Sequence, residues 1–91
     1  MSYRIKRTKR FDKDAELAKK RGKDLDKLFD VIEKIASGKD LEPKFRDHFL
    51  KGQYEGFREC HIEPDWLLIY EILDDCLILV LNRTGTHSDL F

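Results

Sequence analysis

Two amphipathic segments joined by a very short link constrain the fold more than any other feature of this 91-residue chain. The first covers about residues 9–21 and ends before Gly22, in the position that glycine favours past a helix C-terminus. The second covers about residues 24–37, with Asp24 as its N-cap and Gly38 after its end. The apolar residues at helical spacing are Phe11, Ala15 and Ala18 in the first segment and Leu25, Leu28, Phe29, Ile32, Ile35 and Ala36 in the second. A link of two or three residues predicts that the two helices pack as an antiparallel hairpin.

Four other segments have the composition or alternation of β-strands. They are residues 3–8, 53–61, 66–72 and 76–81. The last two are near-continuous apolar runs, which is typical of strands covered on one face and partly shielded on the other. Gly56 interrupts the second strand and indicates a bulge, and residues 39–51 show no periodicity. The order predicts a single α+β domain over residues 1–91, a β-α-α-β-β-β fold with a helical hairpin packed on a largely antiparallel four-stranded sheet.

The composition favours a cytoplasmic protein. Hydrophobic residues make up 41% of the chain and charged residues 40%, so a compact core must sit inside a heavily charged surface. No apolar stretch approaches the roughly 20 residues that cross a bilayer, and the first residues lack the apolar run of a secretory signal. Cys60 and Cys76 have no metal-type spacing and are expected to be small core side chains.

The formal net charge of zero conceals a strong asymmetry along the chain. Residues 1–23 contain ten Lys or Arg against three Asp or Glu, whereas residues 24–91 contain eight against fifteen. The basic candidates for contact with a nucleic acid or an acidic partner are Arg4, Lys6, Arg7, Lys9 and Arg10. The alternative is an ordinary solvated helix face. Balanced net charge means that any nucleic-acid binding is local.

Titratable side chains gather at the ends of the predicted strands. Arg83 follows the last apolar run, and His87 lies in the tail beyond it. His61 and Asp65 flank the turn between two strands, and His48 lies in the irregular segment. Arginine is a permanent planar anion donor, and histidine exchanges a proton most readily near neutral pH. Each residue alone is more often structural, but together they indicate chemistry on a phosphate.

RNA cleavage without a metal needs these residue types. A base takes the proton of the 2′-hydroxyl, an acid protonates the departing 5′-oxygen, and a cation stabilises charge on the phosphate oxygens. Phe91 or Trp66 is flat enough to stack on an exposed base, although packing in the core explains Trp66 equally well. The sequence has no HxxH, HxxxH or CxxC pattern and no glycine-rich phosphate loop, so neither a metal nor a cofactor is expected.

Two long motifs in register resemble the YafQ-type toxins of the RelE/ParE superfamily. They are YEGFRECHIEPDWLLIY at residues 54–70 and RTGTHSDLF at residues 83–91. The shorter segments LAKKRG at 17–22 and DHFLKG at 47–52 match in order and spacing too. The resemblance covers nearly the whole chain.

The resemblance implies a RelE-like fold and a bacterial toxin that enters the A site of the 70S ribosome and cuts mRNA as it is translated. It implies a metal-free mechanism and neutralisation by a cognate antitoxin, with operator DNA contacted only through that antitoxin. By motif position, the implied roles are general acid for His87, phosphate ligand for Arg83, activation of the 2′-hydroxyl for His48, His61 and Asp65, base contact for Phe91, and placement of Asp65 for Trp66. Which member of the activating group is the general base stays open.

Two other functions compete with the nuclease. One is a ParE-like, non-enzymatic inhibitor of a protein target such as DNA gyrase, and the other is a plain interaction module. Neither function needs proton-transfer groups, so the histidines and Asp65 argue against both.

Overall fold

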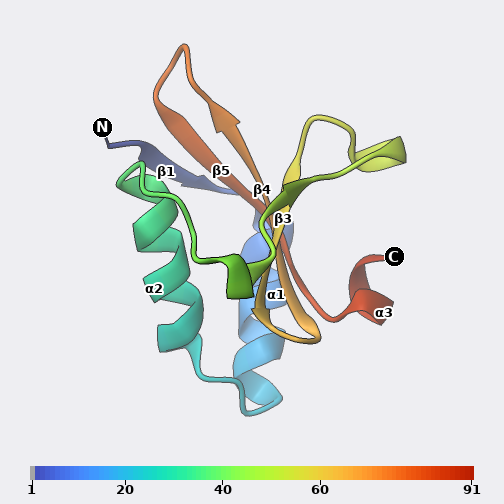
Figure 1. Ribbon diagram of the computed structural model, residues 1–91. Helices are drawn as coiled ribbons and strands as arrows, with labels where there is room; N and C mark the ends of the chain where they lie inside the picture. Colours follow the sequence, from blue (N-terminus) through green and yellow to red (C-terminus); the bar gives the residue numbers. More distant parts are fainter. Residues whose placement is uncertain (1) are drawn as a thin grey trace.

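The computed structural model describes residues 2–91, with the elements labelled in Figure 1. In chain order they are β1 (Arg4–Arg7), α1 (Lys9–Lys20), α2 (Leu25–Ala36), η1 (Pro43–Phe45), β2 (His48–Phe49), η2 (Gly52–Tyr54), β3 (Arg58–Glu63), β4 (Trp66–Leu73), β5 (Ile78–Gly85) and α3 (His87–Leu90). The predicted α+β class and its order of two helices between the first and the later strands are confirmed.

The two long helices start and stop where the sequence predicts. The side chain of Thr8 accepts a hydrogen bond from the amide of Phe11, and Asp24 accepts one from Asp26, so each first turn is capped. Gly22 takes a φ of 83° after the end of α1, a conformation that favours glycine. Figure 1 shows α1 and α2 on the same side of the sheet, joined by a short turn. No helix within residues 2–91 is long and apolar enough to cross a bilayer.

The sheet has the strand order β1-β5-β4-β3-β2. β1 pairs in parallel with β5, where Arg4 faces Ile78, and all other neighbours are antiparallel. The prediction of a largely antiparallel sheet is therefore confirmed, but the number of strands differs. The two-residue β2 adds a fifth strand to the expected four, because a segment that short cannot show alternation in sequence.

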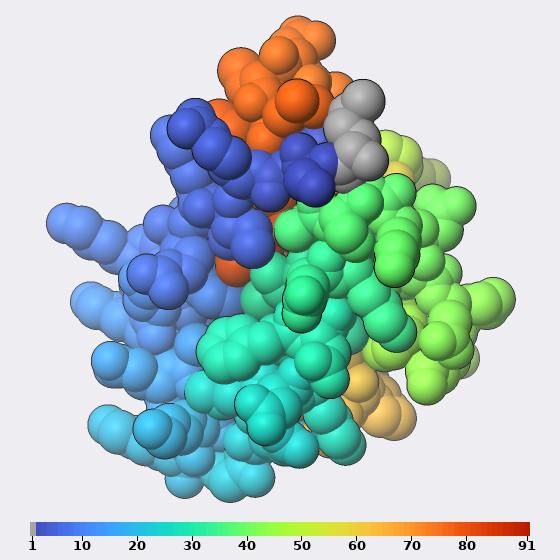
Figure 2. All heavy atoms as spheres, turned by 90° about the vertical axis from the view of Figure 1, so that its left-hand side faces the viewer, coloured from blue at the N-terminus to red at the C-terminus, as the bar shows by residue number. Residues whose placement is uncertain are grey.

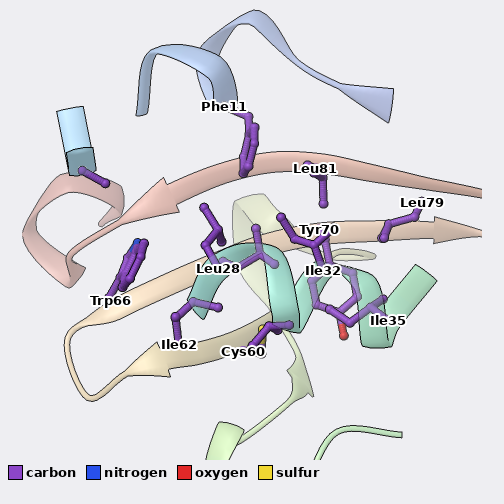
Figure 3. Packing of buried hydrophobic residues seen from close by; sticks show 13 residues of the cluster. Phe11, Leu28, Ile32, Ile35, Cys60, Ile62, Trp66, Tyr70, Leu79 and Leu81 are labelled. Carbon is purple, nitrogen blue, oxygen red and sulfur yellow. The ribbon is translucent and has the colours of Figure 1, made fainter. Parts of the chain in front are cut away.

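Most of the core lies between the sheet and the helical hairpin. Figure 3 shows Phe11, Leu28 and Trp66 pointing into this space. The buried residues of this cluster are Phe11, Ala18, Leu28, Val31, Ile32, Ile35, Cys60, Ile62, Trp66, Leu68, Tyr70, Leu79 and Leu81. The opposite face of the sheet carries a second, smaller cluster. It contains Leu67, Ile69 and Leu90, with Leu50, Tyr54 and Phe57 packed against it.

Four details differ from the sequence prediction. Residues 53–57 form η2 and a turn, so β3 begins later than expected. Phe29 is 51% exposed, because it lies at the edge of the apolar stripe and not at its centre. Cys60 is buried as predicted, but Cys76 is exposed in the turn between β4 and β5. The tail after β5, for which no helix was predicted, contains the short helix α3.

Candidate active site

A row of paired residues crosses four strands on the face of the sheet that the long helices leave open. His48 on β2 pairs with Glu59 on β3, Glu59 pairs with Ile69 on β4, and Ile69 pairs with Arg83 on β5. Residues paired across a sheet project to the same face, so the register brings together side chains far apart in sequence. His61 lies two residues beyond Glu59 and therefore shares this face.

A bulge in β5 puts Arg83 on this face. The register with β4 shifts by one residue, which leaves Asn82 as the extra residue. Strict alternation would turn Arg83 to the same side as Leu81, beneath the helices. Beyond the bulge, Arg83 is instead opposite Ile69, and Thr84 points into the core, where it is 1% exposed.

The three histidines converge. The ring centroids of His48 and His61 are 6.5 Å apart, and those of His61 and His87 are 5.7 Å apart. They come from β2, β3 and the first residue of α3. The convergence that sequence could only suggest is therefore present in the structure, with His61 as the central ring.

Asp65 is bonded to His87. Its Oδ1 accepts a hydrogen bond from the backbone amide of His87 at 2.9 Å and lies 2.6 Å from the ring Nδ1. A carboxylate only accepts, so the ring donates from Nδ1 and leaves Nε2 free. The backbone bond, followed by the ring bond, lowers the pKa of Asp65 below its ordinary value. The sequence grouped Asp65 with His48 and His61, whereas the structure joins it to the histidine on the other side.

Glu59 is the carboxylate that lies beside the other two histidines, His48 and His61. Its Oε1 lies 3.5 Å from Nε2 of His48 and 3.6 Å from Nε2 of His61, and its side chain is 6% exposed. Each of these rings can donate from Nδ1 to a backbone carbonyl, that of Arg46 for His48 and that of Pro64 for His61. Sequence reasoning missed Glu59, although its position two residues before His61 in a strand was a usable signal.

Arg83 is held by a carboxylate from α1. Its Nε lies 2.7 Å from Asp14 Oδ2 and its NH2 lies 3.2 Å from Oδ1, and both side chains are mostly buried. Asp14 also accepts the amide of Thr84 at 3.2 Å, which caps the edge of β5 beyond the end of β1. The bond to Asp14 raises the pKa of Arg83 above its ordinary value, and Tyr54 adds to this. Asp14 was also missed, because 69 residues separate it from its partner.

The tail that carries His87 is fixed by Asp89. The carboxylate accepts hydrogen bonds from Arg21 NH1 at 2.6 Å and from the amide of Thr86 at 2.9 Å. In return, the amide of Asp89 donates to the hydroxyl oxygen of Thr86 at 3.1 Å. These bonds hold the pKa of Asp89 well below its ordinary value, and the bond from Arg21 has the largest effect. Gly85 is required here, since a Cβ at that position would lie 2.9 Å from Asp89 Oδ2 and 3.0 Å from its Cβ.

Comparison with known proteins identifies the family. Residues 3–91 match the family described as "Bacterial toxin of type II toxin-antitoxin system, YafQ". The chain belongs to this family. It is 42% identical over 82 residues to the mRNA interferase toxin YafQ of Escherichia coli strain K12, an alignment that covers 89% of this chain and 87% of that protein.

Solved structures agree with this assignment. The crystal structure of YafQ from E. coli strain BL21(DE3) matches with a TM-score of 0.92 and 38% identity over 98% of each chain. A chain of the E. coli DinJ-YafQ toxin-antitoxin complex matches with a TM-score of 0.90 and 38% identity, covering 100% of this chain and 99% of that one. The resemblance found in the sequence and the RelE-like fold that it implies are confirmed.

In this YafQ-family chain, the two aromatic candidates have different positions. Trp66 is 1% exposed, and its Nε1 donates to the hydroxyl of Thr84 at 3.0 Å, so the expected substrate contact is wrong for this side chain. It packs in the core directly after Asp65 and fixes the start of β4. Phe91 is 59% exposed, with its ring edge-on to Tyr54 at 5.5 Å, and is accessible to a ligand.

The basic N-terminal residues are remote from the histidines. Arg4, Lys6 and Arg7 lie on β1, at the opposite edge of the sheet from β2, and Lys9 and Arg10 begin α1. All five are exposed, and Arg7 pairs with Asp12 at 3.3 Å. They form a surface separate from His48, His61 and His87, which together are called the histidine row. Over residues 2–91, no group of three or more His, Cys, Asp or Glu side chains is arranged to hold a metal ion.

Proposed function

We propose that this toxin is an endoribonuclease that cuts mRNA as it is translated, in the A site of the 70S ribosome. The observation that carries the proposal is the convergence of three histidines on one open face, with Asp65 bonded to the outermost ring. The name of the E. coli relatives, mRNA interferase, supports the same activity. The 2′-hydroxyl would lose its proton and attack the adjacent phosphorus while the bond to the 5′-oxygen breaks, which leaves a 2′,3′-cyclic phosphate.

His87 is the general acid in this proposal. Asp65 holds the ring by Nδ1 and by the backbone amide, so the ring keeps one tautomer and one orientation. Nε2 is then free to give a proton to the departing 5′-oxygen. Asp65 is a positioning residue here, comparable to the carboxylate that orients histidine in a catalytic triad.

The group that accepts the proton of the 2′-hydroxyl is formed by His48, Glu59 and His61. One carboxylate oxygen of Glu59 faces the Nε2 atoms of both histidines. A proton that reaches either ring therefore meets a carboxylate within 4 Å, which stabilises the charged ring after the transfer.

Arg83 stabilises the charge that grows on the phosphate oxygens. A guanidinium has five N–H donors. Asp14 engages Nε and NH2, and the Tyr54 hydroxyl is a further neighbour, so some of the five donors remain for a phosphate. Asp14 thus limits the motion of the arginine without using all its donors, which is the preorganisation that favours transition-state binding.

A small antitoxin is the expected inhibitor. The E. coli YafQ chain that this protein resembles has been crystallised as a complex with DinJ. We infer a cognate antitoxin for this chain, with operator DNA contacted through it, and a cytoplasmic site of action together with the ribosome. The exposed basic residues of β1 and α1 are candidates for the antitoxin or ribosome contact, and an acidic antitoxin would be steered to them.

Substitution of His87 tests the activity. His87→Gln removes the acid but retains a polar side chain of similar size, and His87 is exposed, so the fold should be kept. Loss of one general acid should slow cleavage by about 100- to 10,000-fold and abolish growth arrest. Primer extension on a cellular message after induction measures the cuts, and circular dichroism checks the fold. A folded His87→Gln protein that still arrests growth and cuts mRNA would contradict the proposal.

The same experiment separates the competing functions. Cuts at codon boundaries in cells that express the unmodified toxin support the nuclease. Intact mRNA together with arrested replication would instead indicate an inhibitor of a protein target such as DNA gyrase.

A further inference from the structure

A hollow lies beside the histidine row, between α2, η1 and the end of β3. Its volume is about 620 Å³, within the range of roughly 300–1,000 Å³ typical of small-ligand sites. His61 lines both this hollow and the histidine row. Figure 2 shows α2 (teal), the segment that holds η1 (green) and the turn after β3 (gold) on neighbouring parts of one surface. A chain bound at the central histidine can therefore continue into this groove.

The groove has an apolar floor and a cationic rim. The floor is formed by Val31, Phe45 and Ile62. The rim carries Lys27, Lys34, Lys44 and Arg46, against the acidic Asp30 and Glu63, so cations outnumber acids four to two. An aromatic and aliphatic floor with cations around it suits a base and its phosphate, the two parts of a single-stranded nucleotide.

Two of these lysines are loosely held. Lys34 and Lys44 share Glu42 at 3.8 and 3.9 Å, and all three side chains are about half exposed or more. Ion pairs that are long and exposed contribute little to stability, so a phosphate can replace the carboxylate at small cost. Both ammonium groups lie within 5.6 Å of the Phe45 ring centre, which gathers charge around the floor.

Arg46 connects the groove to the histidines. It has a φ of 50°, which is uncommon for a residue other than glycine, and its carbonyl lies 2.6 Å from Nδ1 of His48. Its exposed guanidinium lines the groove and forms no ion pair with any acid in residues 2–91. Strained backbone of this kind is found where function requires a fixed geometry. Arg46 thus orients His48 through its own backbone carbonyl, and its guanidinium, unpaired within residues 2–91, is available to a ligand in the groove.

We propose that this groove binds the RNA on the 5′ side of the scissile phosphate. The proposal rests on the proposed nuclease function. The groove adjoins the side of the site where His48 and His61 would activate the 2′-hydroxyl, and the nucleotide that carries this hydroxyl is the one on the 5′ side. Arg46 and the two loosely paired lysines neutralise its phosphates, and the apolar floor takes its base. An acidic peptide of the antitoxin is the competing occupant.

Variants of Arg46 test the groove in the whole toxin with programmed ribosomes. Arg46→Asn removes the cation but keeps a residue that tolerates positive φ, and Arg46→Lys keeps the charge. Arg46→Asn should raise KM roughly tenfold with kcat unchanged, as expected for a lost hydrogen bond to a charged group. It should also reduce the salt dependence of log(kcat/KM) by about 0.7, the contribution of one phosphate on a single strand. Arg46→Lys should retain most of the activity.

Lys13→Gln is the matched control, because Lys13 is an exposed cation on α1 outside the groove. A fall in kcat alone for Arg46→Asn would mean that Arg46 only orients His48 and would overturn the binding role. Unchanged kinetics with weaker antitoxin binding would assign the groove to the antitoxin. If the unmodified toxin cuts no mRNA, the nuclease function and the groove proposal both fail.

Photocrosslinking gives an independent outcome. 4-Thiouridine is placed on either side of the cleavage position in the mRNA, and the His87→Gln toxin prevents cleavage. Crosslinks from the 5′ side should map to the groove, and those from the 3′ side should not. Crosslinks to the groove from the 3′ side alone would overturn the assignment.

Discussion

The two faces of the sheet are built differently. Beneath the helical hairpin, thirteen buried residues form one continuous cluster. On the open face, the hydrophobic cluster within residues 2–91 has three buried members, packed under η2 and the four-residue α3. The first face carries most of the hydrophobic stabilisation, and the second carries the histidines. The site therefore rests on the thinner layer, and the tail that covers that layer also supplies His87.

The largest effect is expected from a cavity beneath the helices. Leu28 is fully buried, and Leu28→Ala should lower the free energy of unfolding by about 2–5 kcal/mol. Urea denaturation followed by circular dichroism measures it. The control is Phe29→Ala at the exposed neighbouring position, which should change stability much less. Equal losses for both variants would contradict the packing described for α2.

A cavity on the open face should cost less stability and more activity. Leu90 is 5% exposed, and Leu90→Ala should cost about 2 kcal/mol, the low end for such changes, because α3 can undock instead of leaving a void. Cleavage should fall by more than the loss of stability alone would explain, since undocking removes His87 from the site. Hydrogen exchange of the α3 amides reports the undocking. Protection in α3 equal to that of the unmodified protein, with lost activity, would show that Leu90 acts in another way.

The smallest effect is expected from acid. The folded pKa of Asp89 lies below its ordinary value of 3.8, so its stabilisation is present above that value and is lost as pH falls through the folded pKa. The pKa of Asp65 is lowered in the same direction. Acid should therefore loosen α3 before it unfolds the helix-covered face. Chemical shifts of the Ser88 and Leu90 amides during an acid titration measure this.

Asp89→Asn is the control for the acid titration. It removes the titrating group and should leave α3 loosened already at neutral pH, with a weaker response to acid. An acid transition in α3 that is the same with and without the Asp89 carboxylate would show that other groups dock the tail.

The same contrast explains which parts the sequence could predict. Helices α1 and α2 follow from local signals, since periodicity, caps and terminal glycines all lie within a few residues of one another. The cap of α3 was also readable, because Thr86 and Asp89 have the spacing of a capping box. The bulge at Asn82 was not, since it depends on register with β4. The partners Asp14 and Glu59 are fixed by tertiary contacts between distant segments, which no local pattern encodes.

The parallel pairing of β1 with β5 has a consequence for how the toxin is made. β5 lies between β1 and β4 in the sheet, yet it is synthesised after every other strand. A growing chain thus holds β1 without any neighbour until β5 inserts, and pairings so distant in sequence form slowly. His87 follows β5, so the histidine row is assembled last of all. Each new copy therefore lacks the complete histidine row until β5 and α3 have been added.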